Sequence, residues 1–520
     1  MDSSTNPGSA LGSKAASGVG WNVAGVLVRS AAAFFINIVL ARLLGPEPFG
    51  LVALSMAVIT LGNLLVDSGL SIQLIREPVL ATKTIRAVFT LQVALGGGLT
   101  VCLMLAAPLL SSLLAQPGAV TVIRTLALLL LLNSAGQPSA ALLRRDLRFK
   151  TLQQIQIVSY LLGYGALGLP LAFAGAGVWA LVWAQLSQAA CGTVCNWMLV
   201  RHSLLPWIGA ESRSLLRFGS YLAGSNAVCW SLAAMPSLLI GRAIGSGALG
   251  FYNRAWNLAG LPSSTLVPAL QNVTMPLFSR MPAESATLGR AFLSVLSVSA
   301  LVVFPSSLLI AGSATALVPL LFGPAWMAAI PLFAPLACAM GLDAVASLCG
   351  TFLISRGRPD LELRAMLMAA GCGAIVLALG AAGGASLAVF AWMVCLCIYL
   401  VRAVAASVFA VRIGGVKWGQ FGAALRSGAL LGAAVFSSAY GTAVALAPTP
   451  PWMRLAACGS AAVCAAALLV LMLPRLLLYS DLAWAICRSG APLSFAVAGW
   501  LERRQTRIRR PASGLVDEVP

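Results

Sequence analysis

Residues 41–50 read Ala-Arg-Leu-Leu-Gly-Pro-Glu-Pro-Phe-Gly, and residues 241–250 read Gly-Arg-Ala-Ile-Gly-Ser-Gly-Ala-Leu-Gly. The two stretches share an arginine and two glycines at a spacing of 200 residues: Arg42, Gly45 and Gly50, then Arg242, Gly245 and Gly250. Each stretch follows one long apolar segment. A matched position in two halves of a chain is the mark of a duplicated helical unit, and membrane transporters are commonly built from such repeats.

The composition of the 520-residue chain excludes a soluble globular protein. Hydrophobic residues make up 60% of the chain and charged residues only 9%, whereas a soluble domain carries about 25% charged residues. Apolar stretches of roughly 18–25 residues recur along the chain, which is the length that spans a bilayer. The sequence therefore predicts an all-α polytopic membrane protein with about fourteen transmembrane helices.

The predicted segments lie at about 19–41, 51–72, 87–110, 121–142, 152–174, 177–200, 218–241, 257–279, 291–312, 327–354, 365–381, 386–411, 427–447 and 453–473. The eighth and the eleventh are the least regular. Pro262, Pro268 and Pro276 interrupt the eighth, and the eleventh is short. Proline is tolerated in membrane helices where neighbours or water satisfy the carbonyls that it frees.

The basic residues test this count independently. With the amino terminus in the cytoplasm, the cytoplasmic loops and tails hold 26 of the 33 lysines and arginines, and the outer loops hold five. This bias follows the rule that positive charge stays on the cytoplasmic side, so both termini are predicted to be cytoplasmic. The net charge of +19 then reflects topology and contact with anionic inner-leaflet lipids. Nucleic-acid binding is disfavoured because short loops share the basic residues.

The repeat also predicts the domain boundaries. Residues 1–17 form a cytoplasmic tail, 18–217 a first six-helix lobe, 218–415 a second, 416–474 a helix pair, and 475–520 an interfacial segment with a basic cytoplasmic tail. Because six is even, both lobes begin at the same membrane face and are parallel copies around a central cavity.

No motif in the chain indicates an enzyme, an ATP-driven pump, a metal site or a cofactor site. Residues 1–17 contain no apolar core, so the first helix is expected to act as the insertion signal. The twelve cysteines are interpreted as packing residues.

An arginine in the first segment is the leading candidate for a substrate contact. Arg29 would cost about 2.5–3.5 kcal/mol at a helix centre, so it normally faces water or a partner. Spacings of three and four residues place it in a narrow stripe of polar or small residues: Asn22, Gly25, Arg29, Ala33 and Asn37. The stripe predicts a cavity wall whose positive charge holds an anionic group such as phosphate. The alternative is a structural arginine bonded to carbonyls or to Asp67.

Arg402 is the second intramembrane arginine. It precedes Arg412 by ten residues, roughly 15 Å along a helix, so it can line the cavity or extend towards the interface. Asp67 and Asp343 are the acidic residues within predicted segments. Each is a candidate to carry a coupling proton or cation, although structural pairing with an arginine is the favoured interpretation. The sign of the buried charge favours an anionic substrate.

The eighth segment is too polar to face lipid. Its polar residues include Asn257, Ser263, Ser264, Gln271 and Asn272. We expect it to line the pathway or a hinge, the alternative being a kinked, buried structural helix. Arg254 precedes it in an outer loop and joins Arg42 and Arg242 at the outer mouth, where the repeated pair is expected to fix each lobe's turn.

Five motifs in a fixed order resemble one known family. They are Ala41-Arg-Leu-Leu-Gly-Pro-Glu-Pro-Phe-Gly-Leu51, Asp67-Ser-Gly-Leu-Ser71, Ile240-Gly-Arg-Ala-Ile-Gly245, Leu249-Gly-Phe-Tyr-Asn-Arg-Ala255 and Met275-Pro-Leu-Phe-Ser-Arg280. The chain is similar to the Wzx-type bacterial polysaccharide flippases of the multidrug/oligosaccharidyl-lipid/polysaccharide exporter superfamily, over about residues 15–425.

The resemblance implies two six-helix lobes with a cationic central cavity. It implies movement of an undecaprenyl-diphosphate-linked oligosaccharide (an exopolysaccharide, capsule or O-antigen repeat unit) from the cytoplasmic to the periplasmic leaflet of the bacterial inner membrane. Polysaccharide polymerase machinery is the expected partner, and the extra helix pair would shape a groove for the lipid tail. Two alternatives remain: an ion-coupled small-molecule antiporter of the superfamily, with twelve helices and buried carboxylates, or a membrane scaffold without a polar cavity.

Overall fold

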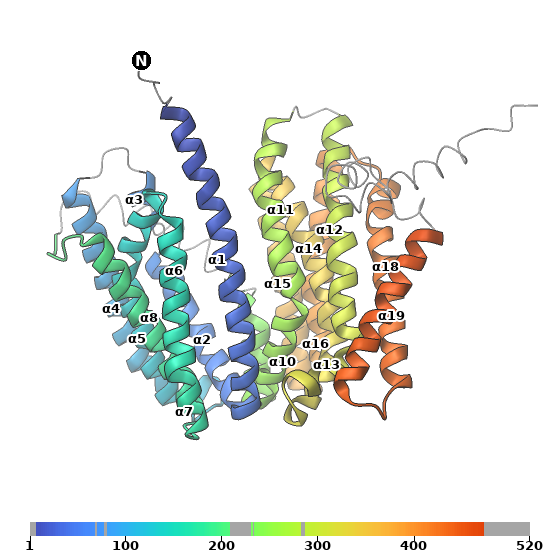
Figure 1. Cartoon of the computed structure of the whole chain (residues 1–520), viewed down its shortest axis with the longest axis horizontal. Helices are drawn as coiled ribbons and strands as arrows, with labels where there is room; N and C mark the ends of the chain where they lie inside the picture. The colour runs from blue at the N-terminus through green and yellow to red at the C-terminus, as the bar shows by residue number, and fades with distance from the viewer. Residues whose placement is uncertain are drawn as a thin grey trace, which may run out of the picture. The chain divides into compact units, whose positions relative to one another are not determined.

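A computed structural model of the chain describes residues 7–67, 70–76, 81–207, 230–231, 233–281 and 286–472, and these contain helices and no strand (Figure 1). The chain forms two compact units. Unit 1 comprises the described residues up to Arg254 with Leu321–Ala329 and Ala374–Phe390. Unit 2 comprises Ala255–Leu320, Ile330–Gly373 and the described residues from Ala391 onwards.

The helices of the first half of the chain all belong to unit 1. They are α1 (Pro7–Leu44), α2 (Pro46–Asp67), α3 (Leu70–Arg76), α4 (Thr82–Leu113), α5 (Ala119–Arg145), α6 (Phe149–Tyr160), the π-helix η1 (Leu161–Gly168), α7 (Leu169–Phe173) and α8 (Val178–Val200). A helical stretch at 233–243 and the start of α10 (Ser246–Ala259) complete the contiguous part of this unit.

The second half of the chain contains most of unit 2, together with the two segments that belong to unit 1. Its helices are α11 (Leu261–Arg280), α12 (Ala286–Gly312), α13 (Ala314–Leu321), the 3-10 helix η2 (Pro324–Leu332), α14 (Phe333–Ser355), α15 (Pro359–Ala382), α16 (Leu387–Val394), the π-helix η3 (Cys395–Leu400), α17 (Val401–Gly414), α18 (Trp418–Ala445) and α19 (Pro451–Met472). The core of unit 2 includes four phenylalanine rings that pack edge-on or tilted against one another: Phe278, Phe292, Phe352 and Phe421.

The expectation of a multi-pass helical membrane protein is confirmed. Within the described residues, eleven helical spans are long and apolar enough to cross a membrane, and each coincides with a predicted segment. The remaining predictions are the first, seventh and eighth segments, so the number fourteen stays a prediction. The seventh begins outside the described residues. Residues 1–6 of the predicted amino-terminal tail and everything from residue 475 onwards also lie outside them, whereas residues 7–17 are the first turns of α1. The eighth corresponds to the proline-containing α11.

The two repeated stretches form one junction within unit 1. Gly45 has a φ of +73° and Gly245 a φ of +115°, so both occupy the left-handed region that glycine tolerates after a helix. Gly50 lies directly against the carbonyl of Ser246, and Gly250 lies against that of Pro46, where a side chain on either glycine would collide with backbone. The repeated glycines therefore end one helix and allow the next to approach its counterpart.

Side chains at this junction also exchange contacts in matched pairs. Arg42 Nε donates to the carbonyl of Leu321, the last residue of α13, at 2.7 Å, and Arg242 donates to the carbonyl of Leu113, the last residue of α4. Trp326 Nε1 donates to the carbonyl of Ala41 at 3.0 Å, and Gln116 Nε2 donates to that of Gly241 at 3.2 Å. These donors bond carbonyls at or near the ends of helices, where backbone acceptors lack a full set of intrahelical partners.

Candidate functional site

Arg29 lies where α1 packs closely on α6. At Gly25, one turn before Arg29, a β-carbon would lie 2.6 Å from Cβ of Gln153, so glycine permits the approach of the two helices. Arg29 Nη1 then donates to Oε1 of Gln156 on α6 at 2.9 Å. Among the described residues, Arg29 contacts no carboxylate, and Asp67 instead accepts a hydrogen bond from Ser71 at 2.8 Å.

Gln156 also lines a cavity of about 470 Å³ between α2, α5, α6 with η1, and α8. Its wall contains six carboxamide side chains: Asn133, Gln137, Gln156, Gln185, Gln188 and Asn196. Ser159, Thr193 and Tyr164 add hydroxyl groups, Arg144 adds a positive charge, and none of the described residues that line the cavity is a carboxylate. The cavity wall in this unit therefore consists largely of neutral polar groups, and the charge that Arg144 adds to it is positive.

A second polar chain runs beside this cavity. Asn37 Nδ2 donates to the hydroxyl of Tyr160 at 3.0 Å and to the carbonyl of Ala33 at 2.8 Å. Arg254 Nη2 donates to Oδ1 of Asn37 at 3.2 Å, and its guanidinium lies 3.9 Å from the centre of the Phe49 ring. Arg254 thus lies inside helix α10, whereas the sequence placed it in a loop.

The π-helix η1 positions the aromatic part of this wall. Tyr160 ends α6 and Tyr164 lies within η1, and the two rings stack with their centres 4.8 Å apart. A β-carbon at Gly163 would lie 2.6 Å from the carbonyl oxygen of Ala184, so η1 packs tightly on α8. Short π-helical turns are often found at functional sites.

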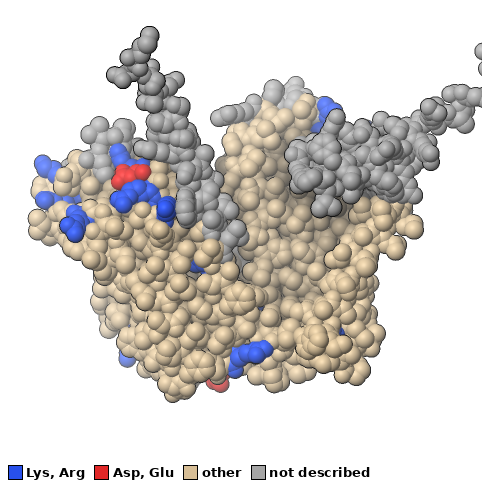
Figure 2. Space-filling model, in the orientation of Figure 1, with Lys and Arg blue, Asp and Glu red and all other residues tan. Residues whose placement is uncertain are grey.

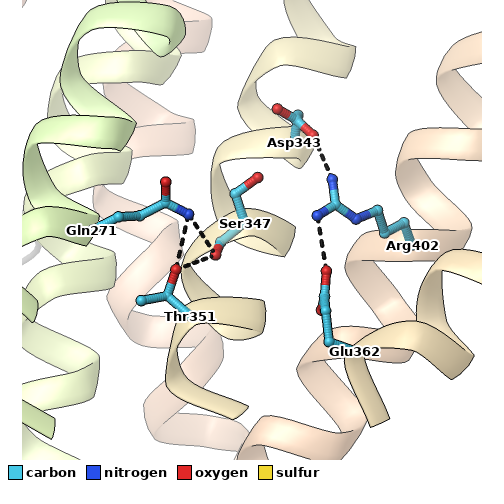
Figure 3. A network of polar contacts seen from close by, with 6 residues as sticks. All are labelled: Gln271, Asp343, Ser347, Thr351, Glu362 and Arg402. Carbon is cyan, nitrogen blue, oxygen red and sulfur yellow. Dashed lines mark hydrogen bonds and ion pairs between the residues drawn. The ribbon is translucent and has the colours of Figure 1, made fainter. Parts of the chain in front are cut away.

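Arg402 has a different environment in unit 2. Its Nη1 lies 2.9 Å from Oδ1 of Asp343, and its Nη2 lies 2.9 Å from Oε1 of Glu362. Figure 3 shows the guanidinium between the two carboxylates, which come from α14 and α15. The side chains of Arg402, Asp343 and Glu362 are 16%, 30% and 7% exposed, so the charges are largely removed from solvent.

The backbone of α14 makes room for this ion cluster. A β-carbon at Gly350 would lie 2.6 Å from Oε2 of Glu362, so the glycine allows the carboxylate to approach the helix. Within the described part of the chain, Oε2 of Glu362 is buried and accepts no hydrogen bond. The cluster contains two acids and one base, and it can hold one proton or cation in addition to the arginine.

Most of the predicted polar residues of the eighth segment line one cavity, and Ser263 and Ser264 are among them. Gln271 Nε2 donates to Oγ1 of Thr351 at 2.8 Å and to the carbonyl of Ser347 at 3.1 Å (Figure 3). Gln271 and Asn257 line a cavity of about 320 Å³ in unit 2, together with Asp343. Asn272 is exposed and lies outside that lining. The side chain of Asn22 falls outside the described residues.

The carboxamides of the cavity and Glu362 were not predicted from the sequence. The carboxamides do leave a signal, because Gln185, Gln188, Gly192 and Asn196 follow one another at spacings of three and four residues along α8. This is the same periodicity that marked the stripe on α1. Glu362 was assigned to a loop because α15 begins at Pro359, earlier than the apolar window.

Comparisons with known proteins agree with this architecture. Residues 39–331 match the family of polysaccharide biosynthesis proteins. The lipopolysaccharide biosynthesis protein WzxC of Escherichia coli (strain K12) is 25% identical over 358 residues, which cover 68% of this chain and 72% of WzxC. The succinoglycan biosynthesis transport protein ExoT of Rhizobium meliloti (strain 1021) is 25% identical over 337 residues, or 64% of this chain and 67% of ExoT.

Solved structures show the same fold. The lipid II flippase MurJ, in an inward closed conformation, has a TM-score of 0.68 at 8% identity, covering 87% of this chain and 99% of MurJ. An inward-facing multidrug resistance MATE transporter of the MOP superfamily has a TM-score of 0.56 at 17% identity, covering 73% of this chain and 94% of that structure. The chain is a multi-pass membrane protein with a transporter fold, and it belongs to the polysaccharide biosynthesis protein family.

Proposed function

We propose that the protein moves an undecaprenyl-diphosphate-linked oligosaccharide from the cytoplasmic to the periplasmic leaflet of the bacterial inner membrane by alternating access. The family match, the names of WzxC and ExoT, and the fold shared with MurJ support this substrate class. The oligosaccharide would be a repeat unit of an exopolysaccharide, a capsule or an O-antigen. Polysaccharide polymerase machinery would take the product at the periplasmic face.

The environment of Arg29 supports a role for this residue in binding the diphosphate. Arg29 is held by the neutral amide of Gln156, so its positive charge is positioned without being neutralised among the described residues. A guanidinium presents a planar fork of donors that matches two phosphate oxygens. A diphosphate could therefore bind Arg29 without first displacing a carboxylate, and the adjoining cavity offers polar groups to the rest of the head group.

The basic residues support an orientation for unit 1. Figure 2 shows lysine and arginine side chains gathered at one end of this unit. Lys83 lies in the first turn of α4, and Arg144 and Arg145 lie in the last turn of α5. By the positive-inside rule this end faces the cytoplasm and its anionic lipids. Reporter fusions after Arg42, Lys150 and Arg254 should read outside, inside and outside, and a swapped reading would contradict the orientation.

Substitution of Arg29 tests the transport proposal. Arg29→Ala and Arg29→Glu should abolish export, and Arg29→Lys should retain part of it because lysine keeps the charge but loses the fork. The measurement is lipid-linked oligosaccharide accumulating at the inner leaflet, normalised to transporter abundance. Arg124→Ala is the matched control, because Arg124 is exposed on α5 and bonds only a carbonyl in the same unit. Wild-type export by Arg29→Ala at normal abundance would exclude this site and leave Arg402 as the next candidate.

A further inference from the structure

The cavity beside Arg29 contains more free hydrogen-bonding capacity than the fold uses. Gln137, Gln188 and Asn196 line it and are partly exposed, and Oδ1 of Asn196 is buried and accepts no hydrogen bond in the described part of the chain. Ser159 is only 2% exposed, and its hydroxyl also has no partner in the described part of the chain. Buried polar groups are normally hydrogen-bonded, so unused groups that surround one cavity indicate a ligand or water that satisfies them.

Other polar groups on the same wall already form hydrogen bonds within the protein. Thr193 Oγ1 donates to the carbonyl of Leu132 at 2.8 Å, and Asn133 Nδ2 donates to Oδ1 of Asn63 at 3.1 Å. Gln156 accepts from Arg29. The free groups therefore lie on α5, α6 and α8, on three sides of the cavity, rather than along one helix.

The chemistry of the wall selects among ligand classes. Among the described lining residues a cation would find Arg144 and no carboxylate, and an apolar molecule would leave the amides without partners. Carboxamides both donate and accept hydrogen bonds, and hydroxyl groups of a sugar do the same. A volume of about 470 Å³ lies within the range of roughly 300–1,000 Å³ for small-ligand sites.

We infer that this cavity, lined by Gln137, Ser159, Gln188 and Asn196, is a binding subsite for the neutral sugar nearest the diphosphate. Gln156 joins it to Arg29, so one amide holds the phosphate-binding arginine on one side and borders the sugar on the other. The inference rests on the proposed transport of a lipid-linked oligosaccharide. It adds that the protein binds the sugar itself, in addition to the lipid diphosphate.

The experiment compares two probes on purified full-length protein in lipid nanodiscs. One probe is undecaprenyl diphosphate without sugar, and the other is the lipid-linked oligosaccharide extracted from a host strain that lacks the transporter. Wild-type protein should bind the glycolipid at least 10-fold more tightly. Gln188→Leu and Asn196→Leu should each weaken glycolipid binding about 5- to 10-fold, as expected for lost hydrogen bonds, and leave binding of the sugar-free probe unchanged.

Two further variants separate loss of the subsite from general damage. Gly192→Leu should fill the cavity without removing an amide, because a β-carbon there would meet only Ser159, at 3.5 Å and beyond. It should weaken glycolipid binding in the same way. Gln154→Leu is the matched control, since Gln154 is exposed on α6 and does not line the cavity.

The outcomes distinguish this inference from the proposed function. If wild-type protein binds both probes equally, or if Gln188→Leu and Asn196→Leu bind the glycolipid as wild type does, the sugar subsite is wrong while lipid transport can stand. If Gln154→Leu weakens binding as much as the cavity variants do, the subsite is also overturned. If neither probe binds, the proposed function itself fails.

Discussion

Arg29 in unit 1 and Arg402 in unit 2 present the same guanidinium in opposite electrostatic settings. Arg29 is oriented by one neutral amide, that of Gln156, whereas Arg402 lies between the carboxylates of Asp343 and Glu362. A charge that is positioned but not neutralised remains available to a mobile anion. A charge already surrounded by carboxylates holds helices together, and it can bind an anion only after an ion pair is broken.

The difference also separates two ways of building a polar interior. The cavity of unit 1 gathers weak neutral groups that each form and release hydrogen bonds at small cost. The cluster of unit 2 concentrates strong charges that depend on one another. Transport requires binding and release, so the first arrangement suits a substrate path and the second suits a structural or ion-responsive element.

The largest expected effect follows from removal of Arg402. Arg402→Ala would leave Asp343 and Glu362 facing each other, and breaking a buried pair in this way costs about 3–5 kcal/mol. Little folded protein should accumulate, as measured by membrane abundance and size-exclusion profile. Adding Asp343→Asn and Glu362→Gln to Arg402→Ala should restore abundance, because all three charges are then absent. Normal abundance of Arg402→Ala alone would contradict the structural assignment.

A carboxylate placed beside Arg29 should neutralise its charge, as Asp343 and Glu362 do for Arg402 in unit 2. Gln156→Glu would turn the 2.9 Å bond into a charge-assisted one, so the substrate anion must compete with an internal partner. Export should fall about 10-fold, corresponding to about 1.4 kcal/mol, while abundance is unchanged. Gln154→Glu on the exposed side of α6 is the control. Equal export by Gln156→Glu and wild type would show that the Arg29 charge is not used.

Removal of Arg29 should affect stability far less than removal of Arg402. Arg29→Ala loses one hydrogen bond to a neutral amide, which contributes about 0.5–1.5 kcal/mol or less in a partly exposed site. The thermal midpoint of the purified protein should therefore shift by only a few degrees. A collapse in abundance comparable with that of Arg402→Ala would remove the distinction between the two arginines.

The smallest expected effect is a pH dependence of stability that arises from His202 in unit 1. His202 follows α8, and its Nε2 lies 2.9 Å from the hydroxyl of Ser139. Burial lowers the pKa of His202 below its ordinary value of 6.5, so the unfolded chain takes up the proton first as the pH falls. Stability is therefore fully present above pH 6.5 and decreases as the pH falls below it. The thermal midpoint should decline slightly from pH 7 to pH 5.5, and this decline should disappear in His202→Gln.

The membrane spans and the two intramembrane arginines could be predicted because each is visible in a short stretch of sequence. Hydropathy located the segment that became α14, and a charge within an apolar run identified Arg29 and Arg402. The partners of these arginines could not be predicted in the same way. Gln156 lies 127 residues from Arg29, and only the packing of α1 on α6 brings the two together.

Glu362 shows a second limit of the sequence. A carboxylate lowers local hydropathy, so an apolar window excludes the residue that a buried arginine needs. The structure includes Glu362 in the first turns of α15, where Gly350 of α14 leaves space for it. Short helices such as α3 and α13 were missed for the related reason that they do not reach the length of a span.

The matched contacts at the junction of residues 41–50 and 241–250 have a consequence for the origin of the protein. In a homodimer with a two-fold axis, residue i of one subunit contacts residue j of the other, and residue j of the first contacts residue i of the second. Gly50 against Ser246 and Gly250 against Pro46 obey this exchange, so the junction retains the form of a homodimer interface inside one chain. Gly50→Ala and Gly250→Ala should therefore be equally harmful. The duplication predicted from the sequence would explain this symmetry, because two joined copies can keep a shared contact while they mutate independently elsewhere.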